Sequence, residues 1–209
     1  MSQRIQSQSL ASSIDSFDKI PDRIRELSKS LIKAANGKMF PVDFMTIAAL
    51  KRTYGNHTGF KSLIENSNMS AARSLLRIQV DTMIRYHAIW LVDQPHDFAA
   101  DIMDGARIDK ITDRDGNKMR DFYLINKLKN EYDWLPEVYS RLSGYVHFSG
   151  SHISSAVDQL NEKEIIFNIS DTEKFPEISW IEAVDCFTEC TLILFRYIYG
   201  WIKTKDMAG

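Results

Sequence analysis

Residues 68–92, NMSAARSLLRIQVDTMIRYHAIWLV, decide the fold. Their apolar side chains recur at helical spacing and cover roughly two thirds of the circumference of one long helix, which ends before Pro95. The positions that form this surface are Leu75, Leu76, Val80, Met83, Tyr86, Trp90 and Leu91. A surface helix shows only one apolar stripe, so a helix this apolar lies in the middle of a bundle. The segment therefore predicts an all-α protein built around it.

The polar arc of the same helix carries Arg73, Arg77, Asp81 and Arg85, each four residues after the last. Side chains at this spacing are neighbours on a helix surface, and opposite charges there form local salt bridges. A second interpretation makes the arc the basic wall of a functional cleft. Both interpretations stay open on the sequence.

Further helices are expected on both sides of the central one. Pro21 suits the first turn of a helix that stops at Asn36-Gly37, and a second helix starts at Pro41. Later helices are expected at residues 95–106, 120–132, 136–146 and 176–203, with another short one over 151–162. Residues 164–169, EIIFNI, are the one credible strand.

Residues 54–59, YGNHTG, read as a loop because they contain two glycines, and we place a domain boundary there. The expected organisation is an N-terminal helical extension over residues 1–58 and an up-and-down helical bundle over residues 59–209. A short β-hairpin or strand insertion would interrupt the bundle.

Composition indicates a folded protein without a membrane span. Of 209 residues, 44% are hydrophobic and 26% are charged, the balance of an ordinary globular chain. We expect disorder only in the polar first dozen residues, which lack the basic start and apolar run of a secretion signal. No stretch reaches the run of about 18 apolar residues that a membrane span needs. Cys186 and Cys190 lie four apart with poor geometry for a disulfide, so we expect reduced, half-buried thiols and a soluble cytoplasmic protein.

The distribution of charge argues against an extended nucleic-acid-binding surface. The net charge is −2, which gives no global attraction to a polyanion. Residues 1–60 carry nine Lys and Arg against five Asp and Glu, a balance of +4, so the remainder carries −6. Binding of nucleic acid therefore needs a local basic pocket, and the N-terminal helices would be an arm for RNA or a partner.

Two acidic patterns could form a cation site, but other interpretations explain both of them better. Asp97, Asp101 and Asp104 share one side of a helix, where carboxylates can hold a divalent cation, but a solvated face near a helix N-terminus explains them better. Residues 113–117, DRDGN, look like a calcium loop but place apolar residues at the first and last ligand positions. We interpret them as the turn of a short hairpin and expect no metal and no cofactor.

Residues 139–152, YSRLSGYVHFSGSH, carry the constellation that points to chemistry. Arg141 and His147 are separated by five residues, with Gly144 between them and a helix terminator after them. Side chains six positions apart on an ideal helix lie about 120° and about 9 Å apart, so they do not meet on a regular helix. They converge if the helix deforms or ends between them, or if a two-fold axis brings a second copy alongside. A helix C-terminus would also favour the cationic form of His147.

This pattern resembles the signature of the HEPN superfamily, an Arg followed within a few residues by a His near the end of a helix in an all-α bundle. The surrounding Tyr139…Leu142-Ser143-Gly144-Tyr145-Val146-His147 is similar to one bacterial branch of HEPN-like proteins. So is Ala72-Arg73-Ser74-Leu75-Leu76 in the central helix. The resemblance covers roughly residues 60–203.

The resemblance implies a metal-independent endoribonuclease that acts as a homodimer, in toxin–antitoxin, phage-defence or RNA-processing roles. His147 would act as general base on the ribose 2′-hydroxyl or as general acid on the leaving oxygen. Arg141 would hold the scissile phosphate and offset the charge that grows on its oxygens. The further substrate-binding residues would be Ser143, Tyr145, Arg73 and Arg77. RNA and an antitoxin or other partner protein are the implied partners.

Two departures from the family pattern shape the alternatives. Leu142 follows Arg141 where active members often have a polar residue. A catalytically inactive HEPN-like module for protein–protein assembly is therefore the second reading. Ser149 stands where toxins regulated by nucleotide transfer have a Tyr, so we do not expect that regulation. A purely structural role would bond Arg141 to a carboxylate and His147 to a backbone carbonyl.

The other four histidines carry weaker signals. We expect His57, between glycines, and His96, beside the acidic helix, to face solvent. His87 lies at the edge of the apolar arc, where a hydrogen-bonded core histidine is expected. His152 is near the motif, but nothing selects it.

Overall fold

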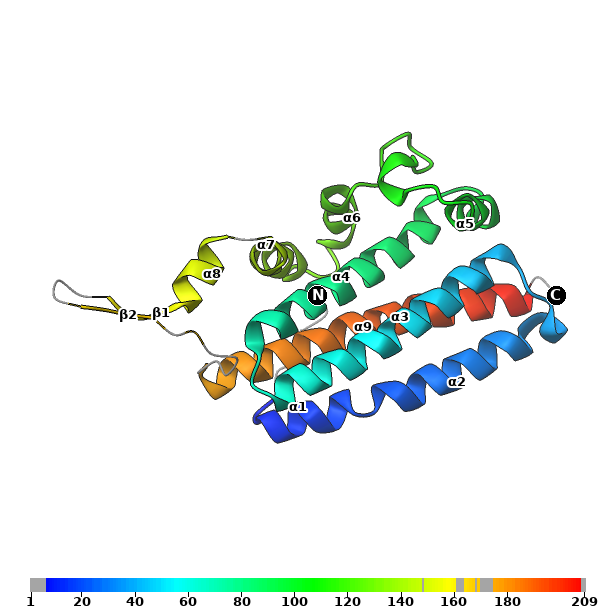
Figure 1. The fold of residues 1–209 in the computed structure, drawn as a ribbon. Coiled ribbons are helices and arrows are strands. Elements are labelled where there is room, and N and C mark those ends of the chain that lie inside the picture. Colours follow the sequence, from blue (N-terminus) through cyan, green and yellow to red (C-terminus); the bar gives the residue numbers. More distant parts are fainter. Residues whose placement is uncertain (1–6, 148, 161–163, 168, 170–174, 208–209) are drawn as a thin grey trace.

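The expected all-α bundle with a small β insertion is confirmed (Figure 1). The computed structural model describes residues 7–147, 149–160, 164–167, 169 and 175–207. Its α-helices are α1 (Leu10–Phe17), α2 (Ile20–Lys33), α3 (Pro41–Glu65), α4 (Met69–His87), α5 (Pro95–Met103), α6 (Asp121–Leu128), α7 (Leu135–Val146), α8 (Gly150–Ser155) and α9 (Glu177–Met207). Short 3₁₀ turns are η1 (Ala34–Gly37), η2 (Ala88–Leu91) and η3 (Ile108–Lys110), and the strands are β1 (Val157–Leu160) and β2 (Ile165–Phe167).

The helix α4 lies at the centre of the bundle, as its apolar surface predicted. It packs lengthwise against α3 and α9, and α6 and α7 cross it as a second layer, seen nearly end-on in Figure 1. Leu76, Val80, Met83 and Ile84 are almost fully buried beneath these neighbours. Asn68 begins the helix, because its side-chain oxygen accepts the backbone N–H of Ala71 at 3.1 Å.

Local sequence signals account for several other helix ends. Prolines lie in the first turns of α2, α3, α5 and α7, where their missing N–H costs nothing. The stop after α2 is also confirmed, since Ala35, Asn36 and Gly37 adopt left-handed φ values of 51°, 57° and 80°.

The loop expected at residues 54–59 is wrong, because α3 runs through it without a break. His57 stacks on the Phe17 ring with centroids 4.1 Å apart, and the Asn56 amide donates to Gln79 at 3.0 Å. A Cβ on Gly59 would lie 3.1 Å from a methyl of Leu75, so this glycine allows α3 and α4 to approach closely. The division between residues 58 and 59 thus falls inside a continuous helix, and one hydrophobic core extends on both sides of it.

The N-terminal segment is ordered from residue 7, which corrects the expected disorder of the first dozen residues within the described range. The backbone N–H and hydroxyl of Ser7 donate to the two Asp185 oxygens at 2.7 and 2.8 Å. Ser9 then caps α1. Residues 1–6 lie outside the described range.

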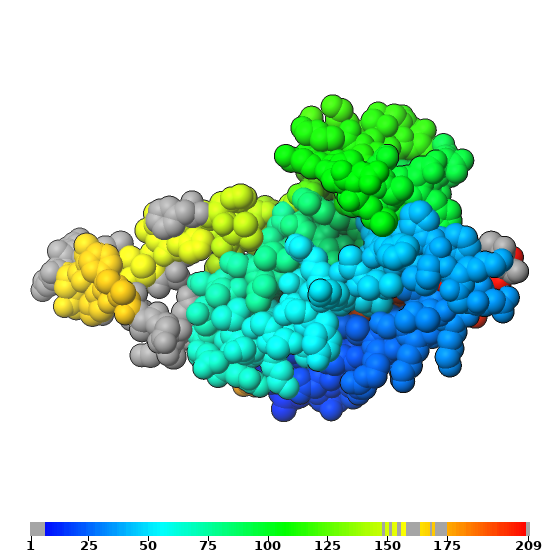
Figure 2. Space-filling model, turned by 45° about the vertical axis from the view of Figure 1, so that its right-hand side comes forward, coloured from blue at the N-terminus to red at the C-terminus, as the bar shows by residue number. Residues whose placement is uncertain are grey.

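The expected strand is confirmed over Ile165–Phe167, and its partner is β1, which the sequence did not reveal. The two strands pair antiparallel with an irregular register, and β1 occupies part of the segment expected as a helix over 151–162. This β arm, β1 and β2, projects from the bundle in Figures 1 and 2. The turn at residues 113–117 also forms as expected, closed by an antiparallel bridge between Thr112 and Lys118.

A buried ion pair joins the C-terminal end of α9 to the start of α3. Lys205 Nζ lies 3.1 Å from an Asp43 oxygen, and both side chains are fully buried. Lys205 also donates to the Leu31 carbonyl at 2.9 Å, and the Trp201 indole N–H donates to Asp43 at 2.8 Å. Every charged atom of the pair therefore has partners, as buried charges require. Among the helices that the structure describes, none has the length and apolar character needed to cross a membrane.

Candidate functional site

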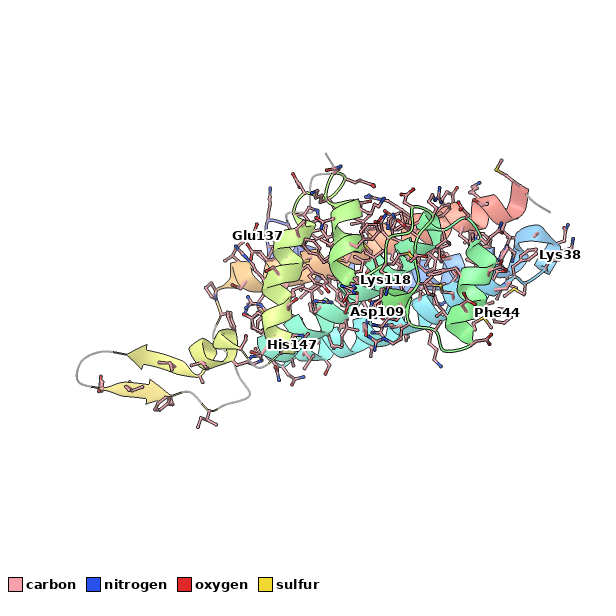
Figure 3. The ribbon with its side chains drawn as sticks, turned by 90° about the horizontal axis from the view of Figure 1, so that it is seen from above. Lys38, Phe44, Asp109, Lys118, Glu137 and His147 are labelled. Carbon is pink, nitrogen blue, oxygen red and sulfur yellow. The ribbon has the colours of Figure 1, made fainter. Side chains whose placement is uncertain are left out.

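The helix α7 carries the motif and ends beside its histidine. Pro136 lies in its first turn, and His147 is the residue after its end, with extended φ and ψ of −105° and 139°. The backbone N–H of His147 still donates to the Ser143 carbonyl at 3.3 Å. Because only this last residue leaves the helix, Arg141 and His147 stay separated along α7. Figure 3 shows Glu137, one turn before Arg141, and His147 toward opposite ends of the helix.

A cavity of about 330 Å³ opens between α4, α7 and α9. Its lining includes Arg73, Leu142, Arg141, Tyr145, Glu182 and Cys186. Three of the predicted site residues, Arg73, Arg141 and Tyr145, therefore meet at one cavity. The two guanidinium groups come from different helices, and Glu182 adds one carboxylate, so the lining carries more positive than negative charge.

Neutral groups hold Arg73 in the cavity wall. Its guanidinium donates to the Tyr145 hydroxyl and lies 4.9 Å from the centre of the Tyr145 ring. The Phe175 ring is 4.8 Å away on the α9 side. Aromatic faces attract a cation without neutralising its charge. Arg73 is thus positioned and still able to attract an anion.

Arg141 makes an exposed ion pair. Its guanidinium lies 2.5 Å from Glu137, one turn earlier on α7, and the two side chains are 74% and 68% exposed. Exposed pairs of this kind contribute little, because water screens both charges. A phosphate can therefore compete with Glu137 for the guanidinium. A purely structural role for Arg141 would also pair it with a carboxylate such as Glu137.

His147 lies outside the cavity lining. It is exposed at the end of α7, one residue beyond exposed Val146. Within one copy, the structure therefore brings Arg141 to the cavity and leaves His147 at the end of the helix. His152 is half-buried and packs on Tyr145, with ring centroids 6.1 Å apart.

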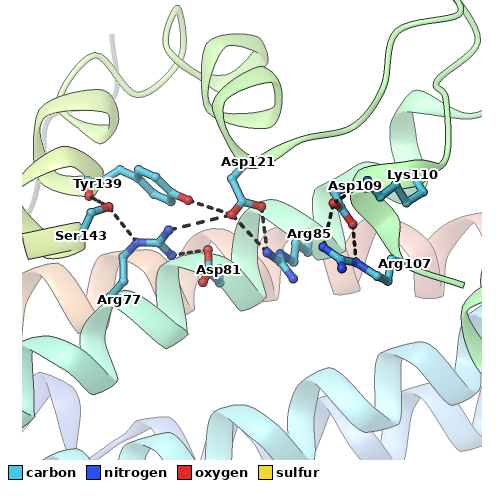
Figure 4. Close-up of polar contacts among 9 residues, drawn as sticks. All are labelled: Arg77, Asp81, Arg85, Arg107, Asp109, Lys110, Asp121, Tyr139 and Ser143. Atoms are coloured by element: carbon cyan, nitrogen blue, oxygen red, sulfur yellow. Dashed lines mark hydrogen bonds and ion pairs between the residues drawn. The ribbon is translucent and has the colours of Figure 1, made fainter. Parts of the chain in front are cut away.

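Arg77 and Ser143, also predicted as substrate-binding residues, belong to a separate network beneath α7 (Figure 4). The Arg77 side chain is only 10% exposed, pairs with Asp81 and lies 3.9 Å from Asp121. It also lies 3.6 Å from the centre of the Tyr139 ring and donates to the Ser143 hydroxyl at 3.4 Å. The i, i+4 ladder of α4 is thus a salt bridge at Arg77 and a cavity wall at Arg73.

Asp121 is the shared acceptor of this network. It accepts two bonds from Arg85, at 2.9 and 3.1 Å, and one from the Tyr139 hydroxyl at 2.9 Å. Burial raises the pKa of Tyr139, and Asp121 adds to the rise, so the hydroxyl keeps its proton and donates. The network fixes α6 and α7 on α4, which sets where Arg141 stands.

The solvent exposure expected for His57 and His96 is wrong, and the burial expected for His87 is confirmed. His57 is buried, and its Nε2 lies 3.1 Å from the Phe17 carbonyl oxygen. His96 is half-buried between the Phe40 and Trp201 rings. His87 is in the core as expected, but its buried Nδ1 has no hydrogen-bond partner in the described chain, and burial lowers its pKa to about 4.

Cys186 and Cys190 are fully buried, more than expected, and form no disulfide. Asp97, Asp101 and Asp104 are exposed. Over the described ranges, no three His, Cys, Asp or Glu side chains gather closely enough to hold a metal ion.

Comparison with known proteins gives no match: no family model, no curated protein and no solved structure is significantly similar to the chain. The resemblance to HEPN proteins therefore depends on the motif residues quoted from the sequence.

Sequence reasoning missed three residues that shape the cavity. The Glu137 partner of Arg141 could have been predicted, because a carboxylate four residues before an Arg on a helix pairs with that Arg. Phe175 lies two residues before α9 and Glu182 lies in its first turns, both far along the chain from Arg73, and no local pattern links them to it.

Proposed function

We propose that this chain is a metal-independent endoribonuclease of HEPN type that acts as a homodimer. The observation that supports it best is that Arg73 and Arg141, from different helices, line one open cavity with Tyr145. Planar guanidinium donors suit the oxygens of a phosphodiester. Arg73 is held by rings and Arg141 by a weak exposed pair, so both remain available to an anion.

In the proposed reaction, His147 takes the proton from a ribose 2′-hydroxyl, whose oxygen attacks the adjacent phosphorus. The bond from phosphorus to the 5′-oxygen breaks, and that oxygen takes a proton from solvent water, leaving a 2′,3′-cyclic phosphate and a 5′-hydroxyl, while His147 returns its proton to solvent. Arg141 and Arg73 offset the charge on the phosphate oxygens. The 2′-hydroxyl as nucleophile makes the reaction specific to RNA.

A second copy supplies the histidine in this proposal. His147 does not line the cavity of its own chain, and it is exposed at the end of α7. A two-fold axis near the end of α7 would bring His147 of one copy to Arg141 of the other, because such interfaces are reciprocal. The setting would be the bacterial cytoplasm, with a role as toxin or phage-defence effector and an antitoxin or other protein as regulator.

One observation favours the second candidate, a catalytically inactive assembly module. The β arm presents Ile165 and Phe167 at 53% and 63% exposure, and Ile169, two residues beyond it, is 95% exposed. Clustered exposed apolar side chains mark protein interaction surfaces. Such a module would assemble with other proteins through the same bundle and leave RNA intact.

Cleavage of single-stranded RNA in excess EDTA tests the proposal. Wild-type protein should yield cyclic phosphate ends, and His147→Ala should abolish cutting while the circular dichroism spectrum and melting temperature stay unchanged. Arg25→Ala, at an exposed arginine that does not line the cavity, is the control and should retain activity. Intact RNA at high wild-type concentration would favour the assembly module.

A further inference from the structure

Two adjoining cavities beside α4 form a second candidate site. They share Arg85, Ile102 and Ile108, and have no lining residue in common with the Arg73–Arg141 cavity. One, of about 490 Å³, lies between α4, the end of α5 and the start of α6. The other, of about 320 Å³, lies between α3, α4 and α5. Both volumes fall in the range of small-molecule sites, about 300–1,000 Å³.

The larger cavity is basic. Arg85, Arg107 and Arg120 line it from separate segments, against the two carboxylates Asp109 and Asp121. Arg107 donates to both oxygens of Asp109 at 2.9 Å. Because Asp121 also accepts from Tyr139, its charge is shared beyond this cavity. In the described part of the chain, the exposed Arg120 guanidinium has no ion-pair partner, so one cationic charge is left over.

These arginines retain donors for a ligand. Arg85 uses only its Nη2 in the two bonds to Asp121, and Arg107 uses Nε and Nη2, as far as the described residues show. Figure 4 shows Arg85 bonded to Asp121 and Arg107 bonded to Asp109, and both arginines line this cavity. An anion with several oxygens can accept from all three arginines without displacing either carboxylate.

The smaller cavity is apolar with polar edges. Met45, Ala49, Ile102 and Ile108 provide aliphatic walls. Arg52, which donates from Nε to the Thr82 hydroxyl at 3.0 Å, stands at the rim with Asp81. A flat ring with nitrogen and oxygen atoms at its edge fits these walls and this rim better than a bare hydrocarbon.

We propose that the two cavities together bind one nucleoside phosphate. The phosphate lies among Arg85, Arg107 and Arg120, and the base enters the apolar cavity over Ile102 and Ile108. The proposal does not depend on ribonuclease activity, because the two sites share no residue. The same chemistry could come from a free nucleotide or from the phosphorylated 5′ end of an RNA strand.

Titration calorimetry on the full chain tests the site with AMP, adenosine and inorganic phosphate as probes. AMP should bind at least about tenfold more tightly than either fragment, because both halves act on one molecule. The double variant Arg107→Gln/Arg120→Gln, changed at exposed side chains, should weaken AMP binding about tenfold. Ile108→Asn should weaken AMP binding and leave phosphate binding unchanged. Arg25→Gln, an exposed arginine paired with Asp22, is the control and should bind as wild type.

Several results would overturn the proposal. These are no binding of AMP at millimolar concentration, phosphate or adenosine binding as tightly as AMP, or a double variant indistinguishable from wild type. A 5′-phosphorylated oligoadenylate distinguishes the two sources. Binding much tighter than AMP identifies an RNA end, equal binding identifies a free nucleotide, and both keep a nucleoside phosphate in the site.

Discussion

Arg73 and Arg77 lie one turn apart on α4 and carry the same charge, but their surroundings differ. Arg73 is held by the Tyr145 and Phe175 rings at an open cavity. Arg77 is 10% exposed and faces the carboxylates of Asp81 and Asp121. The carboxylates offset the charge of Arg77, which holds helices together. The rings do not offset the charge of Arg73, so it can attract an anionic ligand. The neighbours, not the spacing, decide which arginine is structural.

The largest loss of stability is expected where an ion pair is fully buried, at Lys205 and Asp43. Lys205→Met leaves the Asp43 carboxylate buried without its cation, which should lower the free energy of unfolding by about 3–5 kcal/mol. Urea unfolding measures the loss. The control Lys203→Met, at an exposed position two residues earlier, should change it by less than about 0.5 kcal/mol. Equal midpoints for the two variants would show that the Asp43 pair does not stabilise the fold.

A pH dependence should come from His87. Its pKa is about 4 in the folded chain, below the ordinary value of 6.5, because the ring is buried. Between these values the unfolded chain binds the extra proton, so stability falls as pH drops from 6.5 toward 4, by about 3 kcal/mol in total. His87→Phe should flatten this slope in urea melts at several pH values. A variant with the wild-type slope would mean that His87 is not its source.

Removing the cation of the Arg77 network should lower the free energy of unfolding by less than Lys205→Met does. Arg77→Met leaves Asp81 and Asp121 partly solvated, with side chains 22% and 30% exposed, so the loss should be about 1–3 kcal/mol. Thermal melts followed by circular dichroism measure it. The expected order is Lys205→Met above Arg77→Met. The reverse order would show that burial of the ion pair does not determine how much stability is lost with its cation.

The smallest stability effect is expected at the cavity. Arg141→Ala removes only an exposed pair, so unfolding should change by less than about 0.5 kcal/mol, as for Arg25→Ala with its similar pair to Asp22. Affinity for single-stranded RNA should fall for Arg141→Ala and stay unchanged for Arg25→Ala, measured by fluorescence anisotropy. Equal RNA affinity in both variants would remove Arg141 from the site.

Local patterns predicted the helices whose signals are local. The apolar arc of α4, the four first-turn prolines and the Asn36-Gly37 stop each depend on residues within a few positions. The helix over residues 54–59 escaped prediction, because Gly59 is useful only where Leu75 packs against it. Burial of His57 depends likewise on Phe17, forty residues earlier.

The candidate site divides in the same way. Arg141 and its Glu137 partner lie on one helix, and the i, i+4 rule covers both. The different fates of Arg73 and Arg77 depend on Phe175 and Asp121, which come from later helices and neighbouring segments. Spacing alone gives both arginines the same interpretation.

Mixing two inactive variants tests whether each site is shared between two copies of the chain. Arg141→Ala and His147→Ala chains, unfolded and refolded together, should recover about a quarter of wild-type RNA cleavage in EDTA, because half of the dimers are mixed and each holds one complete site. Each variant refolded alone should stay inactive. No recovery, with mixed dimers demonstrated by differential tagging, would contradict a site shared between two copies.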